Sequence, residues 1–267
     1  MKVDSTITLA DVQAVYDGPE GDLWELVMGE QIHIGGLSSS MGLAEAAGIA
    51  PGSSGIDLCC CNGAGMRFLL RFCQVGTMTG VDATDTMISR GRERCEAEGV
   101  GAITEFVQAD VTDIPLDDGA ADFVWGEDAW CYVVDKPKLI SEAVRLVRPG
   151  GTIAFTDWVQ GPVEMTEQEM ERFLGFMKFP NIQSIPGYRS LLEAQNCEIL
   201  HAEDTGRYAE CVQLYIDMLT KQLTYDALKI IGFDMELMQA MGGEMQFMKT
   251  LADEHKIIQG LFVATKH

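Results

Sequence analysis

Short apolar segments alternate with amphipathic helical segments along most of the chain, from residue 55 to residue 266. The segments that predict strands are residues 55–60, 77–82, 103–110, 121–128, 152–158, 197–204 and 257–266. Strands separated by helices favour parallel pairing, because a parallel neighbour requires a long crossover connection. The pattern therefore predicts an α/β fold with a doubly wound, mostly parallel, seven-stranded sheet and helices on both faces.

Two helical segments lie outside this alternation. Residues 1–50 precede the first strand, and we expect a helical cap there, folded over the ligand-binding end of the sheet. Residues 207–254 form a long helical stretch rich in methionine, which suits either a core or an adaptable lid over a pocket. The predicted organisation is a cap over 1–50 and a single domain over 51–267, with the helical lid inserted at about 207–254. A loop is expected over residues 180–190.

Composition and charge narrow the range of partners. Hydrophobic residues make up 47% of the 267 positions, enough for one substantial core. No apolar run approaches the roughly 20 residues of a membrane span, and the first residues lack the order of a signal peptide. The 41 acidic side chains against 19 basic ones give a formal net charge of −22, which repels polyanions. We expect a cytoplasmic protein that binds a small molecule but no nucleic acid or membrane, with a homodimer left open.

The eight cysteines do not form a disulfide framework, since three of them, Cys59, Cys60 and Cys61, are consecutive. Adjacent side chains on an extended strand point to opposite faces, and no CxxC or histidine pair completes a tetrahedral ligand set. We therefore expect reduced thiols and no metal.

Aspartates stand near the ends of the first three predicted strands. Asp57 precedes the first turn, Asp82 ends the second strand and Asp110 ends the third. Ligands of open parallel sheets bind beyond the carboxyl ends of the strands. Gly63 and Gly65 in the first turn permit close backbone approach, and the helix that follows presents free N–H groups. An acid about twenty residues beyond such a turn accepts hydrogen bonds from ribose hydroxyls, so the combination predicts a nucleoside site.

The segment GIDLCCCNGAG from Gly55 resembles the first motif of the class I S-adenosylmethionine-dependent methyltransferases, which commonly reads DLGCGTG. The resemblance covers residues 50 to 160 and implies a Rossmann-like fold with S-adenosylmethionine as cofactor. It implies that Asp57 and Gly63 hold the methionine and ribose part, Asp82 the ribose hydroxyls and Asp110 the adenine amine. Further residues that it assigns to the cofactor site are Cys59, Ala83, Met87, Val111 and Glu127.

The chain departs from this motif at two positions, where Cys59 and Cys61 replace glycines. Side chains there narrow the approach of backbone to cofactor. The outcomes are a displaced cofactor, a different cofactor or lost binding. We favour the first, because Gly63, Asp82 and Asp110 remain.

Three flanking segments extend the similarity over most of the chain. VYDGPEGDLWELVMGEQIHIGG from Val15, EDAWCYVVDKPKL from Glu127 and PGYRSLLEAQNCEI from Pro186 resemble sarcosine/dimethylglycine N-methyltransferases. This resemblance implies transfer of a methyl group to an amine nitrogen, as in glycine betaine formation. The protein then has to align a nucleophile with the S–CH₃ bond and exclude water.

Aromatic and basic side chains are the candidates for the acceptor site. We expect Tyr16, Trp24 and His33 of the cap to close over the reacting groups, with Trp130 and Tyr132 beneath them, since aromatic faces suit a methylated ammonium. The catalytic candidates are Tyr16, His33 and Trp130. The acceptor-binding candidates are Trp24, Tyr132, Tyr188 and Arg189. Arg189 would hold a substrate carboxylate, or else pair with one of the many surface acids.

Other functions stay open from the residues alone. Within methyl transfer, the acceptor atom can be carbon, oxygen or sulfur, as in a quinol or a thiol. A nucleotide-binding oxidoreductase is a second class, although Phe68 occupies the third glycine position of a GxGxxG motif. A non-catalytic nucleotide-binding protein is a third, if the cysteines close the loop.

Overall fold

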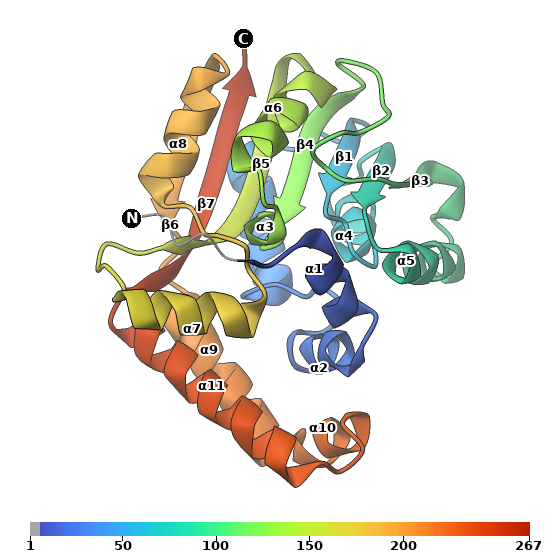
Figure 1. Cartoon of the computed structure of the whole chain (residues 1–267). Helices are drawn as coiled ribbons and strands as arrows, with labels where there is room; N and C mark the ends of the chain where they lie inside the picture. The colour runs from blue at the N-terminus through green and yellow to red at the C-terminus, as the bar shows by residue number, and fades with distance from the viewer. Residues whose placement is uncertain (1–5) are drawn as a thin grey trace.

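A seven-stranded sheet forms the centre of the computed structural model, which describes residues 6–267 (Figure 1). The strand order is β3-β2-β1-β4-β5-β7-β6, in which only β7 runs antiparallel to its neighbours among the described strands. The strands are β1 (Ser54–Leu58), β2 (Thr77–Asp82), β3 (Thr104–Gln108), β4 (Ala121–Glu127), β5 (Val147–Gln160), β6 (Cys197–Asp204) and β7 (Ile257–Lys266). The predicted fold class, a mostly parallel seven-stranded doubly wound sheet, is confirmed.

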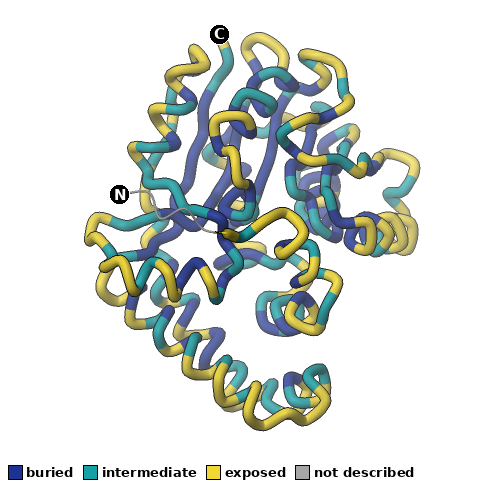
Figure 2. Tube along the Cα trace, viewed as in Figure 1, coloured by how far each residue is buried: buried dark blue, intermediate teal, exposed yellow. Residues whose placement is uncertain are grey.

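Helices cover both faces of this sheet, so its central strands are buried on both sides, whereas the edge strands β3 and β6 are partly exposed (Figure 2). The side chains of β4 alternate, as the two-residue period of a strand requires: Val124 packs on one face and Phe123 and Trp125 on the other. The first face is covered by α6 (Lys136–Leu146) and α8 (Ile185–Ala194). The second is covered by α3 (Gly36–Ala47), α4 (Ala64–Phe72) and α5 (Asp85–Ala97).

A second group of helices lies beyond the carboxyl ends of the parallel strands (Figure 1). It consists of α1 (Leu9–Tyr16), α2 (Pro19–Met28), α7 (Glu167–Met177), α9 (Tyr208–Lys221), α10 (Thr224–Ile230) and α11 (Met235–Asp253). Four of these helices, α2, α7, α9 and α11, share a third apolar core, which includes Val27, Phe173 and Met248. Short 3-10 turns at Gly101–Ile103 and Trp130–Tyr132 complete the described elements.

Three helices occupy the helical stretch expected over 207–254. Gly232 and Phe233 adopt left-handed backbone (φ 66° and 61°), which ends α10. Asp234 then starts α11 by accepting hydrogen bonds from the N–H groups of Glu236 and Leu237. The boundaries at 50 and at 207–254, as divisions into cap, domain and lid, stay predictions. Within the described residues, no helix combines the length and apolarity that a membrane crossing requires.

Candidate active site

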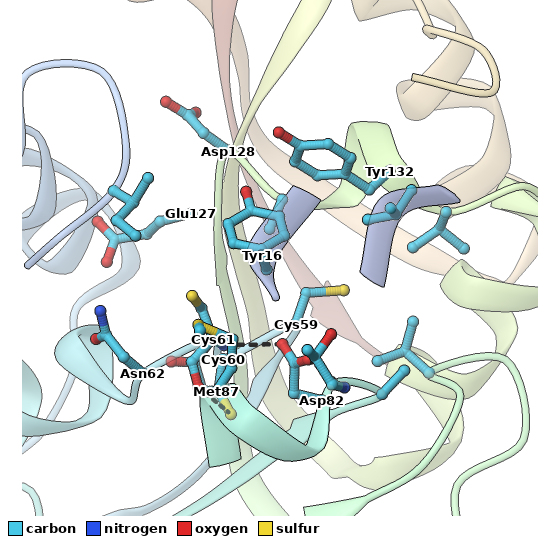
Figure 3. Close-up of a pocket in the computed structure, with 18 of the residues that line it drawn as sticks. Tyr16, Cys59, Cys60, Cys61, Asn62, Asp82, Met87, Glu127, Asp128 and Tyr132 are labelled. Atoms are coloured by element: carbon cyan, nitrogen blue, oxygen red, sulfur yellow. Dashed lines mark hydrogen bonds between the residues drawn. The ribbon is translucent and has the colours of Figure 1, made fainter. Parts of the chain in front are cut away.

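The main cavity lies where the carboxyl ends of β1, β2 and β4 meet α1 and the segment before α3. Its volume is about 190 Å³. β1 stands between β2 and β4, so strand order reverses at this point, which is where open α/β sheets bind ligands. Figure 3 shows side chains from the N-terminal helices and from the strand ends facing this space.

The loop after β1 has unusual backbone geometry. Cys59, Cys61 and Gly63 all have positive φ, at 60°, 48° and 73°. A left-handed conformation is easy for glycine but strained for a residue with a Cβ, by about 1 kcal/mol or more. The chain therefore keeps the backbone path of a glycine-rich turn while placing two thiols at the edge of the cavity. Gly63 itself is the residue before α4 and does not line the cavity.

Asp82 joins this loop to the end of β2. Its Oδ2 accepts a hydrogen bond from the N–H of Cys61 at 2.9 Å, and its Oδ1 accepts one from the N–H of Thr84 at 2.8 Å (Figure 3). Burial raises the pKa of this carboxyl group, while the bonds from Thr84 and Cys61 oppose the rise. Each carboxylate oxygen can accept more than one hydrogen bond, so Asp82 retains capacity for a ligand hydroxyl.

Two further acids lie deeper, beside α4. Burial, followed by the charges of Glu127 and Asp82, raises the pKa of Asp57 well above its usual range. Glu127 accepts hydrogen bonds from Ser40 Oγ at 2.7 Å and from Trp125 Nε1 at 3.0 Å. An added Cβ at Gly65 would lie 2.9 Å from Asp57 Oδ2. The glycine therefore leaves the approach to Asp57 open.

His33 belongs to the same cluster. Its Nε2 lies 3.3 Å from Glu127 Oε1 and 3.1 Å from Ser40 Oγ, and its side chain is buried. The imidazole is therefore both a lining group of the cavity and a hydrogen-bonded member of a buried polar network.

Asp128 places a carboxylate between the cap and the sheet. Its backbone is left-handed (φ 51°), and its Oδ2 accepts hydrogen bonds from the N–H of Ile34 at 2.7 Å and from Gln259 Nε2 at 2.8 Å. Gln259 is fully buried on β7 and also donates to the carbonyl of Ile34 at 3.2 Å. Together these bonds fix the orientation of Asp128.

Aromatic rings and the Asp128 carboxylate line a smaller recess next to the main cavity. Tyr16, Asp128 and Tyr132 line both spaces. The aromatic members of the recess are Tyr16, Trp24, Tyr132, Trp158 and Phe179. Their rings meet edge to face, with centroids 5.7 Å apart for Tyr16 and Tyr132 and 4.8 Å apart for Tyr132 and Phe179. Burial raises the pKa of both tyrosines, so their phenols are neutral.

A buried lysine stabilises the segment between β4 and α6 through hydrogen bonds to its backbone. Lys136 Nζ, 1% exposed as a residue, donates hydrogen bonds to the carbonyls of Cys131 and Val133. Burial lowers the pKa of Lys136 to about 8. Asp157 accepts hydrogen bonds from the N–H of Cys131 at 2.9 Å and from the Tyr188 hydroxyl at 2.6 Å. This network fixes the backbone on which Tyr132 stands.

Most of the residues chosen from the sequence meet in the main cavity. Those that line it are Tyr16, His33, Asp57, Cys59, Asp82, Ala83, Met87, Asp110, Val111, Glu127 and Tyr132. Trp24 lines the aromatic recess instead. Their individual roles stay predictions.

Besides Gly63, three candidates lie outside the lining of both spaces, and the expectations attached to these three have no support from their positions. Trp130 is fully buried in the core, stacked on Phe155 at 4.0 Å. Tyr188 is buried on α8 against Asp157. Arg189 faces solvent and pairs with Glu193 at 2.9 Å, one turn along the same helix. The reason is that α8 begins at Ile185, inside the segment expected to be a loop, and carries both residues away from the cavity.

Some lining residues were not chosen from the sequence. Asn62 follows the three cysteines, is 1% exposed, and its Oδ1 has no hydrogen-bond partner although its amide nitrogen donates to the carbonyl of Glu30. Its position in the glycine-rich motif was the available signal. Gln259 supports the site from β7, and no local pattern indicated it.

The comparisons with known proteins agree with this geometry. A family model described as a methyltransferase domain matches residues 56–155, from β1 into β5. The solved structure of Haemonchus contortus phosphoethanolamine N-methyltransferase 2 superposes with a TM-score of 0.84. That alignment covers 98% of this chain and 60% of that chain at 17% identity. Residues 56–155 therefore carry a methyltransferase domain, and the fold is that of the class I methyltransferases. The family resemblance carried by the loop after β1 is confirmed.

Curated relatives of this chain include two enzymes named for amine substrates. Phosphoethanolamine N-methyltransferase 1 of Zea mays is 24% identical over 258 residues, which are 91% of this chain and 47% of that protein. Sarcosine/dimethylglycine N-methyltransferase of Halorhodospira halochloris is 29% identical over 162 residues, 58% of this chain and 55% of that protein. The chain thus spans about half the length of each of these two relatives.

Proposed function

We propose that this chain transfers a methyl group from S-adenosylmethionine to the nitrogen of a small-molecule amine. Family membership and the cavity at the strand-order reversal support the methyl transfer. One observation carries the choice of nitrogen: the recess beside the cavity combines one fixed carboxylate, Asp128, with five aromatic side chains. Carboxylates and aromatic faces both stabilise an ammonium group.

The residues of the cavity fit the cofactor. Asp82 has free acceptor capacity for the ribose hydroxyls, and Asp110 stands at the mouth of the same cavity for the adenine amine. Asn62 Oδ1 is a buried acceptor without a partner, which suits the ammonium of the cofactor's amino-acid part. Gly65 leaves open the space beside Asp57 that a Cβ would fill. The sulfonium supplies an electrophilic methyl group when bound.

The acceptor nitrogen gains positive charge as it is methylated. Asp128 stabilises that charge, because its carboxylate is held rigidly by Ile34 and Gln259 in a buried site where water does not screen it. Tyr16 and Tyr132 add aromatic faces, and their neutral phenols do not compete for the methyl group. The cluster of His33 and Glu127 is the candidate acceptor of the proton that a primary or secondary amine releases.

A matched pair of acceptors and a pair of variants test this proposal. Purified protein with labelled S-adenosylmethionine is offered tertiary and secondary amines and the alcohols of the same shape. We expect label transfer to amines, and we expect Asp128→Asn to lower kcat/KM for amines at least about tenfold. Asparagine tolerates left-handed backbone, so the loop should keep its shape.

Two measurements complete the design. Calorimetry with S-adenosylhomocysteine should give the same affinity for Asp128→Asn as for the natural protein. Asp117→Asn changes an exposed acid outside the cavity and should alter neither kcat/KM for amines nor the affinity for S-adenosylhomocysteine. Transfer to alcohols, thiols or carbon acceptors with amines inert would contradict the choice of nitrogen. Absence of both cofactor binding and transfer would contradict the whole proposal.

A further inference from the structure

A second cavity lies among the helices beyond the sheet and has almost no polar lining. Its volume is about 220 Å³, and its walls come from α2, α7, α9, α10 and α11. Only Thr220 and Gln246 among its lining residues have polar side chains. Three methionines of α11, Met238, Met241 and Met245, form part of one wall. We call this space the apolar chamber.

The apolar chamber continues the series of spaces that begins at the candidate cofactor site. Trp24 lines both the chamber and the aromatic recess. Tyr16, Asp128 and Tyr132 line both the recess and the main cavity. The three spaces therefore follow one another from the strand ends, past Asp128, into the helices drawn at the lower side of Figure 1. The chamber is therefore next to the recess that Asp128 lines, with Trp24 in the wall of both.

The chemistry of the walls indicates the class of occupant. An apolar cavity offers water few hydrogen-bond partners, and an engineered cavity of about 150 Å³ in another protein stays dry and binds benzene. A chamber of about 220 Å³ therefore has room for a larger apolar group. Methionine side chains adjust to occupants of different shape, because they are unbranched and polarizable. Such a wall suits an alkyl chain better than a polar or charged group.

We propose that the methyl acceptor carries an alkyl chain, which occupies the apolar chamber while the amine lies beside Asp128. This inference rests on the proposed function and assigns a substrate class to it: an amphiphilic amine. Trp24 stands between the two spaces and separates the charged end of the acceptor from its apolar end. Specificity then follows from chain length, since each additional methylene removes apolar surface from water.

A homologous series measures this directly. N,N-dimethylalkylamines with two to ten carbons in the alkyl chain are tested as acceptors, below their critical micelle concentrations. Their binding is also measured calorimetrically in the presence of S-adenosylhomocysteine. We expect affinity and kcat/KM to rise with each carbon, by up to about fourfold for full burial of a methylene group, until the chamber is filled.

Two neighbouring glycines of α11 supply matched variants. An added Cβ meets no atom within 4 Å at either Gly242 or Gly243, but only Gly242 lines the chamber. Gly242→Phe should therefore fill the chamber and abolish the gain with chain length, and Gly243→Phe should preserve it. Both variants keep α11 helical, so a difference between them reports on the chamber. Neither should change affinity for S-adenosylhomocysteine.

The outcomes separate this inference from the function on which it rests. Methyl transfer to short amines without any dependence on chain length overturns the chamber proposal and leaves the amine function intact. A second outcome is that binding depends on chain length, that Gly242→Phe removes this dependence, and that no methyl transfer occurs. That result supports the chamber and overturns the proposed function. Equal loss in both glycine variants overturns the chamber as the site of the chain.

Discussion

The two ends of the candidate site are built on different principles. At the cofactor end, polar groups stand on strand tips and on the turn that follows, and backbone N–H groups fix them, as Cys61 and Thr84 fix Asp82. At the acceptor end, helices from the N-terminal segment and from the insertion between β6 and β7 enclose aromatic and apolar space. The first arrangement specifies one ligand geometry. The second can accept different acceptors by changing side chains, which agrees with the many substrates hosted by one fold.

The largest effect that we expect concerns the support of the acceptor end. Burial raises the pKa of Asp157 from the usual 3.8 to about 6, although Lys136 and the Tyr188 hydroxyl oppose the rise. The folded protein therefore binds the proton more tightly than the unfolded chain. This contribution to stability is complete below about pH 4 and is lost as pH rises through 6. The difference between the two pKa values corresponds to a free energy on the order of 3 kcal/mol.

Asp157→Asn should remove that dependence. The free energy of unfolding of the natural protein, relative to the variant, should fall between pH 4.5 and pH 7.5 in urea titrations at several pH values. Asp117→Asn serves as the exposed control and should follow the natural protein. If the free energy of unfolding changed with pH in the same way for Asp157→Asn and the natural protein, the raised pKa of Asp157 would be contradicted.

At the cofactor end, Asp82→Ala should lower affinity for S-adenosylhomocysteine about 10- to 100-fold, because ligand hydroxyls and the N–H groups of Cys61 and Thr84 lose their acceptor. Titration calorimetry measures this. Asp85→Ala, at the exposed start of α5, is the matched control. Unchanged affinity in Asp82→Ala would remove this residue from the site and with it the contrast between the two ends.

Two cysteines of the loop after β1 allow a test in which the free energy of unfolding should change in opposite directions. Cys61→Gly should raise the free energy of unfolding by up to about 1 kcal/mol, since glycine adopts a φ of 48° without strain. Cys60→Gly should lower it by about 1 to 2 kcal/mol, since Cys60 is buried and has no left-handed backbone. Thermal and urea unfolding measure both. Destabilisation of equal size would mean that the loop stores no strain.

The smallest effect should come from Arg189→Ala. Its guanidinium is exposed and paired with Glu193, so we expect changes within about 0.5 kcal/mol in stability and no change in KM for any acceptor. Steady-state kinetics with carboxylate-bearing and neutral amines provide the measurement. A higher KM only for carboxylate-bearing amines would restore the role that the sequence suggested for Arg189.

The cofactor end was predictable from sequence because its signals are local. Asp82 ends β2 where the apolar run stops, and the glycines of the turn follow β1 directly. The start of α8 was misplaced for a local reason as well: a loop was expected over residues 180–190, which include Pro186, but proline also starts helices. Here Ser184 accepts a hydrogen bond from the N–H of Gly187 and begins α8. Tyr188 and Arg189 therefore turned away from the cavity.

The acceptor end was less predictable because it depends on contacts between distant segments. Trp24 reaches the recess only because α2 packs against α9 and α10, and nothing in its own segment specifies that. Trp130, a catalytic candidate, was chosen because it follows a strand end, yet its ring stacks on Phe155 in the core. Methionine spacing in α11 favoured a core over a lid, and the structure has Met245 and Met248 buried, while Met241 and Met245 line the apolar chamber.

Gln259 also sets an order of events during synthesis of the chain. The bond between Cys61 and Asp82 joins residues 21 positions apart, so the cofactor end can assemble soon after both leave the ribosome. The Gln259 amide that donates to Asp128 lies 131 positions later in the chain, and it lies 225 positions after Ile34, to whose carbonyl it also donates. These bonds can form only after β7 has been synthesised. Until β7 emerges, Asp128 lacks this hydrogen-bond donor and the apolar face that β7 covers stays exposed, which is the kind of surface that makes a nascent chain prone to aggregation.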